Sequence, residues 1–201
     1  APAGPGRGAQ GAAVRAGWRA SLGATPDGAG TRFRVWAPRA RQVEVLLEGA
    51  GTLPLRDAGG GRHEGLAAGA RPGQRYRYRL DGGQDFPDPA SRFQPDGVHG
   101  WSQVVDPSAF AWSDAAWRPR PLAELVLYEL HVGTFTPEGT FAAAAARLPA
   151  LAELGVTAIE LMPVADFPGR HGWGYDGVCP FAPARCYGTP DDLRRLVDRA
   201  H

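Results

Sequence analysis

The strongest constraint on the fold is a change in hydrophobic pattern past the middle of the chain. Before that change, three short runs place apolar or aromatic side chains at every second position: Arg32–Trp36, Val43–Leu47 and Arg75–Leu80. A period of two puts these side chains on one face of an extended chain, which is typical of half-buried antiparallel strands. Turn signals separate the runs at Pro26–Gly28, Gly59–Gly61 and Asp81–Gly83. The pattern predicts a small all-β sandwich.

After residue 121 the runs become almost continuously apolar. Leu125–His131 and Val156–Pro163 lack alternation, as expected for strands buried on both faces of a parallel sheet. Between them apolar residues recur at helical spacing, with Thr140 as the N-cap and Gly155 just past the helix end. Pro149 is expected to kink or restart this helix. The segment therefore predicts a strand–helix–strand unit.

A second helix is expected near the end of the chain, after a long loop that runs from the second strand to Gly188. Thr189 precedes this helix as a capping residue, and Asp191 and Asp192 stand in its first turn. The order suits an α/β barrel or a doubly wound sheet. A closed eight-fold barrel takes roughly 250 residues. Residues 122–201 are therefore predicted to form only its first two βα units, leaving an apolar strand edge that favours aggregation or recruitment of the missing units.

These patterns divide the chain into four parts. Residues 1–16 carry too few apolar side chains to offset the entropy cost of folding, so they are predicted to be a disordered tail. Residues 17–105 form the β-sandwich, and residues 106–121, rich in Trp and Pro, form a packed linker. Residues 122–201 begin the incomplete (β/α)8 barrel. The predicted fold class is a multidomain β plus α/β protein.

Charge and composition exclude several classes of protein. The 22 basic and 21 acidic residues leave a formal net charge of +1, which argues against a nucleic-acid partner. No apolar run approaches the ~20 residues that a membrane span needs, so a cytoplasmic protein that does not bind membranes is expected. Cys179 and Cys186 lack the spacing of a zinc or redox site and are predicted to be free thiols.

The loop at residues 165–178 is the candidate binding segment, because it joins aromatic, acidic and imidazole side chains at the carboxyl end of a predicted strand. Active sites of barrel enzymes are built from such loops. The rings of Trp173 and Tyr175 can stack on the apolar face of a sugar, and the glycines around them let the backbone approach a ligand. In the alternative reading, both rings only pack the mouth of the barrel and His171 is merely solvated.

Longer motifs carry a resemblance to a known family. They are His131–Phe141, Leu154–Val164, Trp173–Gly177, Phe86–Pro95 and Val98–Gly100. Together these runs closely resemble the malto-oligosyltrehalose trehalohydrolases, a family of the α-amylase superfamily, whereas Tyr187–Leu193 marks only the superfamily. The resemblance implies that the sandwich is an immunoglobulin-like module, followed by the start of a catalytic barrel.

The resemblance implies a cytoplasmic retaining hydrolase without metal or organic cofactor. Its activity is the release of trehalose, by hydrolysis of the α-1,4 bond next to the terminal trehalose unit of malto-oligosyltrehalose. Such enzymes need two carboxylates about 5–5.5 Å apart. In the superfamily these groups follow strands beyond the second, so no catalytic residue is predicted here and the chain alone is predicted to be inactive.

The acidic residues that are present have structural explanations. Glu129 and Glu160 fall inside predicted strands, Asp191 and Asp192 cap a helix, and Asp198 is predicted on a solvated helix face. His131, at the end of the first strand, is expected to brace the barrel mouth. None of these residues is predicted to touch substrate.

By the resemblance, Tyr175 matches the tyrosine that stacks on the glucose ring in the −1 subsite, where the bond is cleaved. Trp173, Asp176 and His171 are the further candidates for substrate binding. Two alternatives remain open at this point. One is a fragment of a glycogen branching or debranching enzyme, and the other is a non-catalytic α-glucan-binding module.

Overall fold

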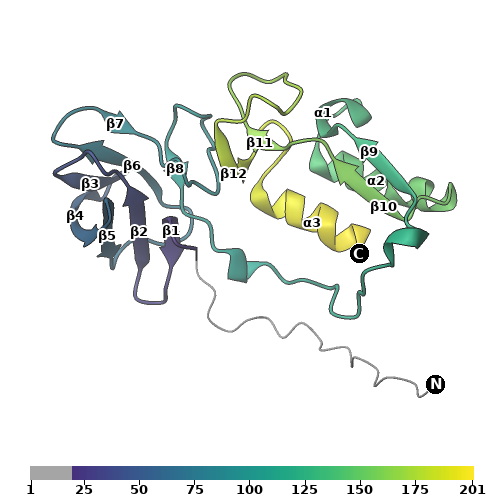
Figure 1. Cartoon of the computed structure of the whole chain (residues 1–201), viewed down its shortest axis with the longest axis horizontal. Coiled ribbons are helices and arrows are strands. Elements are labelled where there is room, and N and C mark those ends of the chain that lie inside the picture. The colour runs from purple at the N-terminus through teal and green to yellow at the C-terminus, as the bar shows by residue number, and fades with distance from the viewer. Residues whose placement is uncertain (1–19) are drawn as a thin grey trace, which may run out of the picture.

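The computed structural model describes residues 20–201, so the tail predicted at residues 1–16 lies outside the described residues. Figure 1 shows a sheet of β-strands on one side and a mixed α/β part on the other, joined by a long extended segment. The strands of the sheet are β1 (Gly23–Pro26), β2 (Thr31–Trp36), β3 (Val43–Leu47), β4 (Gly51–Gly59), β5 (Arg62–Ala67), β6 (Arg75–Leu80), β7 (Asp85–Phe86) and β8 (Ser102–Gln103).

The sheet is antiparallel throughout, with the order β1-β2-β5-β4-β3-β6-β7 and with β8 also paired to β6. The nine-residue strand β4 pairs with β3 through Gly51–Leu55 and with β5 through Arg56–Gly59. The two halves of the predicted sandwich are therefore one continuous sheet that curls over itself, with β4 shared between them. This corrects the expectation of two separate sheets.

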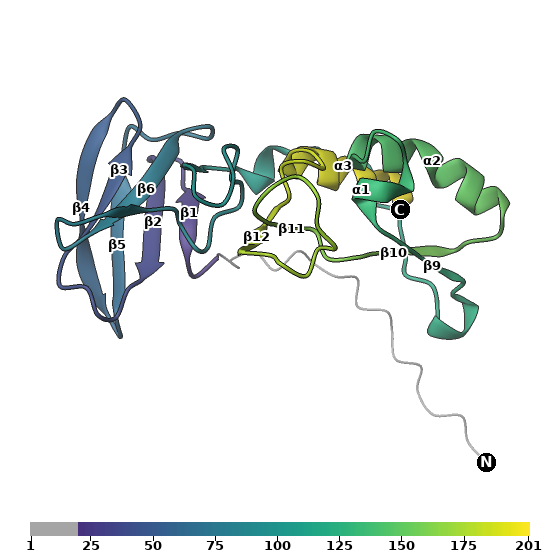
Figure 2. The ribbon, with the colours of Figure 1, turned by 90° about the horizontal axis from the view of Figure 1, so that it is seen from above.

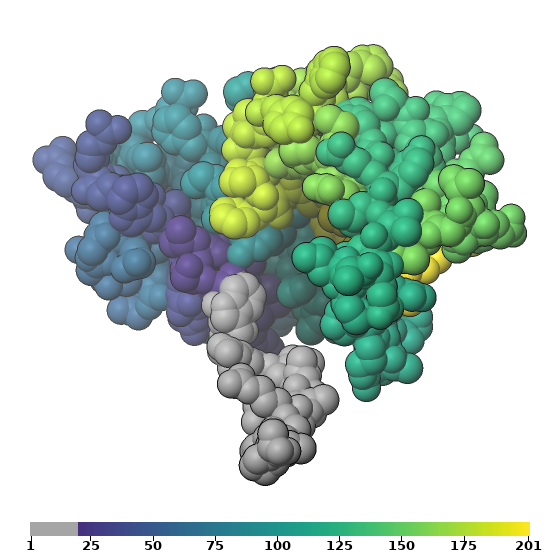
Figure 3. Space-filling view, turned by 45° about the vertical axis from the view of Figure 1, so that its right-hand side comes forward, coloured from purple at the N-terminus to yellow at the C-terminus, as the bar shows by residue number. Residues whose placement is uncertain are grey.

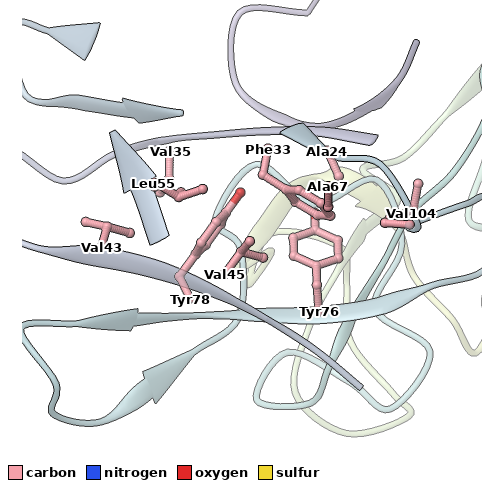
Figure 4. Packing of buried hydrophobic residues seen from close by; sticks show 11 residues of the cluster. Ala24, Phe33, Val35, Val43, Val45, Leu55, Ala67, Tyr76, Tyr78 and Val104 are labelled. Carbon is pink, nitrogen blue, oxygen red and sulfur yellow. The ribbon is translucent and has the colours of Figure 1, made fainter. Parts of the chain in front are cut away.

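The core of the curled sheet lies where the alternating runs predicted it. Phe33 and Val35 of β2 face Val43 and Val45 of β3, and all four are at most 5% exposed. Tyr76 of β6 meets Phe33 edge to face, with ring centroids 4.9 Å apart. Figure 4 shows these side chains converging between the two halves of the sheet. The predicted alternation of buried and exposed residues is thus confirmed for β2, β3 and β6.

The segment from residue 106 to residue 121 crosses to the second part and packs on its last helix. Asp198 of that helix accepts hydrogen bonds from the Ser113 backbone N and hydroxyl, at 2.7 and 2.8 Å. Trp117 stacks on His201, with ring centroids 4.1 Å apart. The prediction that Asp198 lies on a merely solvated face is wrong, because the connecting segment covers it.

The second part contains a β–α–β unit. Its elements are β9 (Leu127–Leu130), α1 (Val132–Phe135), α2 (Phe141–Glu153), β10 (Ala158–Leu161), β11 (Ala165–Asp166), β12 (Cys179–Pro183) and α3 (Pro190–Ala200). Strands β9 and β10 pair in parallel, as predicted. The Thr140 hydroxyl caps α2 by accepting from the Ala143 backbone N, and Thr189 and Asp192 form a capping box at α3.

Three local expectations differ from the structure. Helix α2 runs through Pro149 as one 13-residue element, so the helix does not restart there. A four-residue helix, α1, follows directly on β9, where no helix was predicted. The predicted long loop contains the short antiparallel pair β11–β12. Helix α1 has four residues and β11 has two, which is too short to display a clear hydrophobic period.

Strands β9 and β10 are not buried on both faces. Tyr128, Leu130, Ile159 and Leu161 pack into the cluster formed with the helices. Alternate residues of a strand point to opposite faces, and the alternate set here includes Leu127, which is 57% exposed, and the exposed residues Glu129 and Glu160. Within residues 20–201 no element covers this second face.

A buried carboxyl group ties the end of the curled sheet together. Asp88 is fully buried, and it accepts hydrogen bonds from the Tyr76 hydroxyl at 2.6 Å and from the Ala90 backbone N at 2.8 Å. Burial raises the pKa of Asp88 from 3.8 to about 6, against the lowering effect of these hydrogen bonds. Ionisation of Asp88 therefore costs more in the folded chain than in the unfolded one.

We predict that stability falls with rising pH because of this group. The folded chain holds the Asp88 proton more tightly, so the contribution is complete below pH 4 and is lost as the pH rises through 6. Between pH 4 and pH 7 the unfolding free energy should fall by about 2 kcal/mol relative to that of an Asp88→Asn variant. Urea unfolding of both proteins at the two pH values measures this difference. Parallel pH profiles would refute the assignment.

Candidate functional site

The segment from residue 162 to residue 188 follows β10 and carries the candidate binding residues. Figure 2 shows its strands β11 and β12 between the curled sheet and the helices. In the space-filling view its yellow-green atoms lie against the purple to teal atoms of the sheet (Figure 3). Val98 of the sheet part packs with Cys179 and Ala182 of β12 at this junction. The candidate loop is therefore held at the boundary between the two parts.

Glycines let this segment fold closely onto itself. Gly174 has a φ of +91°, and a Cβ there would lie 2.1 Å from the carbonyl oxygen of Pro163. A Cβ on Gly172 would lie 3.0 Å from the ring of Phe167. At Gly172 and Gly174 the missing Cβ therefore makes room for other parts of the chain.

Arg185 holds the base of the loop. One of its nitrogens, Nη1, donates to the buried Asp166 carboxylate at 2.9 Å and to the Phe167 carbonyl at 3.2 Å, and Nη2 donates to the Gly169 carbonyl at 3.0 Å. Burial raises the pKa of Asp166, while its hydrogen bonds from Arg185 act in the opposite direction. Asp166 Oδ2 has no hydrogen-bond partner among residues 20–201, so Arg185 is the main compensation for this buried group.

His131 links the end of β9 to the loop. Its Nε2 lies 2.8 Å from the Gly172 carbonyl and 3.2 Å from the Tyr187 hydroxyl. A carbonyl oxygen can only accept, so Nε2 carries a proton and donates to Gly172. Nδ1 is then free to accept from the Thr134 hydroxyl, 3.2 Å away. This arrangement fixes the backbone directly before Trp173.

A cavity of about 530 Å³ opens beside this network. His171 and Trp173 line it, and Trp173 is 76% exposed. Tyr175, 70% exposed, and Asp176, also exposed, lie outside its lining. The structure thus brings two of the four predicted residues to the cavity and leaves the other two on the neighbouring surface.

The lining residues that were not predicted as site residues include Met162, Arg170 and Tyr187. Tyr187 lies in the Tyr187–Leu193 motif, which marks the superfamily, so the sequence contained an indication that this residue is important. Met162 lies in the Leu154–Val164 motif and Arg170 in the candidate loop, but neither side chain was singled out for sugar binding. Of the lining residues none is Asp or Glu, so the cavity as described offers surfaces and hydrogen-bond donors rather than an acid–base pair.

Both cysteines are free thiols, as predicted. Burial raises the pKa of Cys179 to about 11 and also raises the pKa of Cys186, so neither is a ready thiolate. Within residues 20–201 no three His, Cys, Asp or Glu side chains converge on a point where a metal could bind. In the same range, no helix has the length and apolar character required to cross a bilayer.

We predict that Arg185→Met destabilises the chain by roughly 3 kcal/mol at pH 7, because it leaves the Asp166 carboxylate buried without a cation. The loss should shrink near pH 4, where Asp166 takes up a proton instead. Urea unfolding of the unsubstituted chain and of the variant at both pH values measures this loss of unfolding free energy. The double variant Asp166→Asn/Arg185→Met is the control and should recover much of the loss at pH 7. Equal losses in the single and double variants would contradict the argument.

Comparisons with known proteins support the family resemblance that the sequence motifs indicated. Residues 21–109 match the family Carbohydrate-binding module 48 (Isoamylase N-terminal domain). The chain is 55% identical over 185 residues to a malto-oligosyltrehalose trehalohydrolase of Deinococcus radiodurans, an alignment that covers 91% of this chain and 30% of that protein. It is 39% identical over 205 residues to a 1,4-alpha-glucan branching enzyme of Streptomyces coelicolor, covering 92% of this chain and 26% of the other.

A solved structure supports the same relationship. A Salmonella typhimurium protein, named provisionally as an alpha amylase, superposes with a TM-score of 0.87 and 48% sequence identity, over 92% of this chain and 32% of its own. The chain thus spans about 30% of the length of the curated trehalohydrolase it matches. The chain therefore resembles the N-terminal part of malto-oligosyltrehalose trehalohydrolases, with a carbohydrate-binding module 48 match at its start, and the resemblance carried by its motifs is confirmed.

Proposed function

We propose that this chain is the N-terminal part of a retaining glycoside hydrolase that releases trehalose from malto-oligosyltrehalose. The hydrolysed bond is the α-1,4 bond next to the terminal trehalose unit. The observation that carries the proposal is the 55% identity to a trehalohydrolase, which extends through the candidate loop. The cavity beside Trp173, at the carboxyl ends of two parallel strands, agrees with this reading, since barrel enzymes bind substrate there.

In this proposal the loop supplies one wall of the sugar site. Tyr175 stacks on the glucose ring in the −1 subsite, and its 70% exposure leaves the ring accessible. Trp173 offers a second ring at the cavity, while Asp176 and His171 hydrogen-bond sugar hydroxyls. His131 holds the loop backbone at Gly172 and acts on substrate only through the position of Trp173.

We also propose that β9 and β10 are the first two strands of a (β/α)8 barrel. The parallel pairing and the one-sided packing of the helices agree with this. The exposed face that bears Leu127, Glu129 and Glu160 would then be the inner face, which further strands cover in a barrel. The carboxylates that cleave the bond would follow those later strands, in the part of the protein beyond these residues. We expect the protein to be cytoplasmic.

A second candidate function is that of a branching enzyme. The 39% identity to the Streptomyces coelicolor enzyme extends over 92% of this chain. The two functions differ in product. A trehalohydrolase liberates free trehalose, and a branching enzyme creates α-1,6 linkages without releasing a disaccharide. The higher identity to the trehalohydrolase favours the first function.

We predict that residues 1–201 alone release no trehalose, because the paired carboxylates of a retaining glycosidase are not part of the candidate loop. The purified chain is incubated with malto-oligosyltrehalose, and free trehalose is measured against a buffer blank. The full-length protein serves as the positive control. It should release trehalose from this substrate and little from plain maltodextrin. Trehalose release by residues 1–201 alone would contradict this, because it would show that the catalytic carboxylates lie within these residues.

A second prediction concerns Tyr175 in the full-length protein. Tyr175→Ala should lower kcat/KM for malto-oligosyltrehalose by about 2-fold to 10-fold, since a stacked aromatic contact is worth roughly 0.5–1.5 kcal/mol. A larger loss is expected if the sugar ring also shifts from its reactive position. Trp112→Ala, another exposed aromatic residue but in the connecting segment, is the matched control and should leave kcat/KM unchanged. Unaltered kinetics of the tyrosine variant would remove Tyr175 from the site.

A further inference from the structure

Residues 94–100 of the sheet part form a tight turn, called here the Gly97 turn. The Gly97 backbone N donates to the Gln94 carbonyl at 3.0 Å, and the Gly100 backbone N donates to the Gly97 carbonyl at 2.8 Å. Gln94 is fully buried, and its Nε2 also donates to the Gly97 carbonyl, at 3.3 Å. The backbone at Gly97 is therefore held from within the turn.

Two arginines of β6 fasten the Gly97 turn to the curled sheet. Arg75 Nη1 donates to the Asp96 carboxylate at 2.7 Å, and Arg77 Nη2 donates to the His99 carbonyl at 2.8 Å. Both acceptors lie within two residues of Gly97 along the chain. The position of Gly97 is thereby tied to that of the sheet.

Arg185, which holds the base of the candidate loop, packs closely against Gly97. Gly97 is buried and has a φ of +87°. A Cβ at this position would lie 3.1 Å from Arg185 Cζ, 3.3 Å from Nη2 and 3.4 Å from Nε. A side chain here would therefore press on the guanidinium, and either that group or the turn would have to move.

The same guanidinium anchors the start of the loop. Its Nη2, one of the atoms that a Cβ at position 97 would approach, donates to the Gly169 carbonyl at 3.0 Å. His131 holds the backbone again at Gly172, directly before Trp173. The loop is thus fixed at two points, and a displaced guanidinium would release the first of them.

We propose that the Gly97 turn positions the sugar-binding loop through Arg185. The curled sheet then takes part in substrate binding without touching the substrate at this point, because it sets the place of the guanidinium that holds the loop. Gly97 is accordingly a positioning residue. The link between the turn and the loop stands on the contacts themselves, whereas its effect on substrate rests on the proposed function.

The test uses the full-length protein and malto-oligosyltrehalose. Gly97→Ala should raise KM by about 2-fold to 10-fold, the equivalent of one weakened stacking contact, and should change kcat by less than about 2-fold. A variant that had only lost stability would contain fewer active molecules, so its apparent kcat would fall at an unchanged KM. The division of the effect between KM and kcat therefore separates positioning from a purely structural role.

Gly73→Ala is the matched control. Gly73 also lies in the sheet part and has a φ of +91°, so the substitution imposes a similar backbone strain. A Cβ there would meet only Gln103 Nε2, at an ordinary contact distance of 3.8 Å. This variant should leave KM and kcat unchanged.

A second comparison asks whether Gly97 acts through Arg185. In the Asp166→Asn/Arg185→Met background the guanidinium is absent, so adding Gly97→Ala should raise KM by less than about 2-fold. Gly97→Asn repeats both measurements with a side chain that adopts a positive φ more readily than alanine does. Unfolding temperatures show which variants are folded.

Several outcomes would overturn the proposal. These are an unchanged KM in the Gly97 variants, an equal rise in KM in Gly73→Ala, or the same rise in the background that lacks Arg185. Failure of both Gly97 variants to fold, while Gly73→Ala folds, would show that the turn serves the fold and not the loop, which also refutes the proposal. Trehalose release by the unsubstituted full-length protein is measured first. Its absence would refute the proposed function, whereas normal release together with any of the other outcomes would refute the positioning role alone.

Discussion

The buried Asp166 carboxylate is the constraint on which the arrangement of the candidate loop depends. A carboxylate removed from water needs a nearby cation, and Arg185 supplies it from the far end of the β11–β12 pair. The same guanidinium donates to the carbonyls of Phe167 and Gly169, so one side chain fixes the start of the loop in three places. A Cβ on Gly97 would lie only 3.1 Å from Arg185 Cζ, so the guanidinium also rests against the sheet part. Arg185 therefore contacts both the loop and the curled sheet, beside the packing of Val98 with Cys179 and Ala182.

The sequence predicted those parts of the fold whose side chains repeat with a clear period. Runs of alternating apolar residues located β3 and β6 at their observed bounds, and β2 to within one residue. Strand β4 was missed because its sequence contains Gly51 and Pro54 and only Leu55 is buried. Its identity as a strand comes from pairing with two neighbours in the tertiary structure, and no local pattern reports such pairing.

The candidate site was predictable in its residue types but not in its shape. Aromatic, imidazole and acidic residues at residues 171–176 mark a binding loop, yet only His171 and Trp173 reach the cavity. Between Trp173, which lines the cavity, and Tyr175, which does not, lies Gly174. Its backbone has a positive φ and lies close to the Pro163 carbonyl. A contact between residues 163 and 174 is tertiary information. Glycines in a loop are visible in the sequence, but whether they make room for a ligand or for the chain itself depends on the tertiary structure.

The packing of the α/β part is concentrated on one side of its strands. A pair of four-residue parallel strands has little independent stability. Leu130 joins a cluster with Phe141, Tyr187 and Leu196, which draws α2, α3 and the loop onto the same face of the strands. The connecting segment adds the Ser113–Asp198 hydrogen bonds and the Trp117–His201 stack on the far side of α3. A cavity of about 510 Å³ remains on this side, between α2, β10 and α3. On the opposite face Leu127, Glu129 and Glu160 are exposed. This asymmetry agrees with the proposed barrel, because the helices of a barrel cover the outer face of its strands and the inner faces pack against one another.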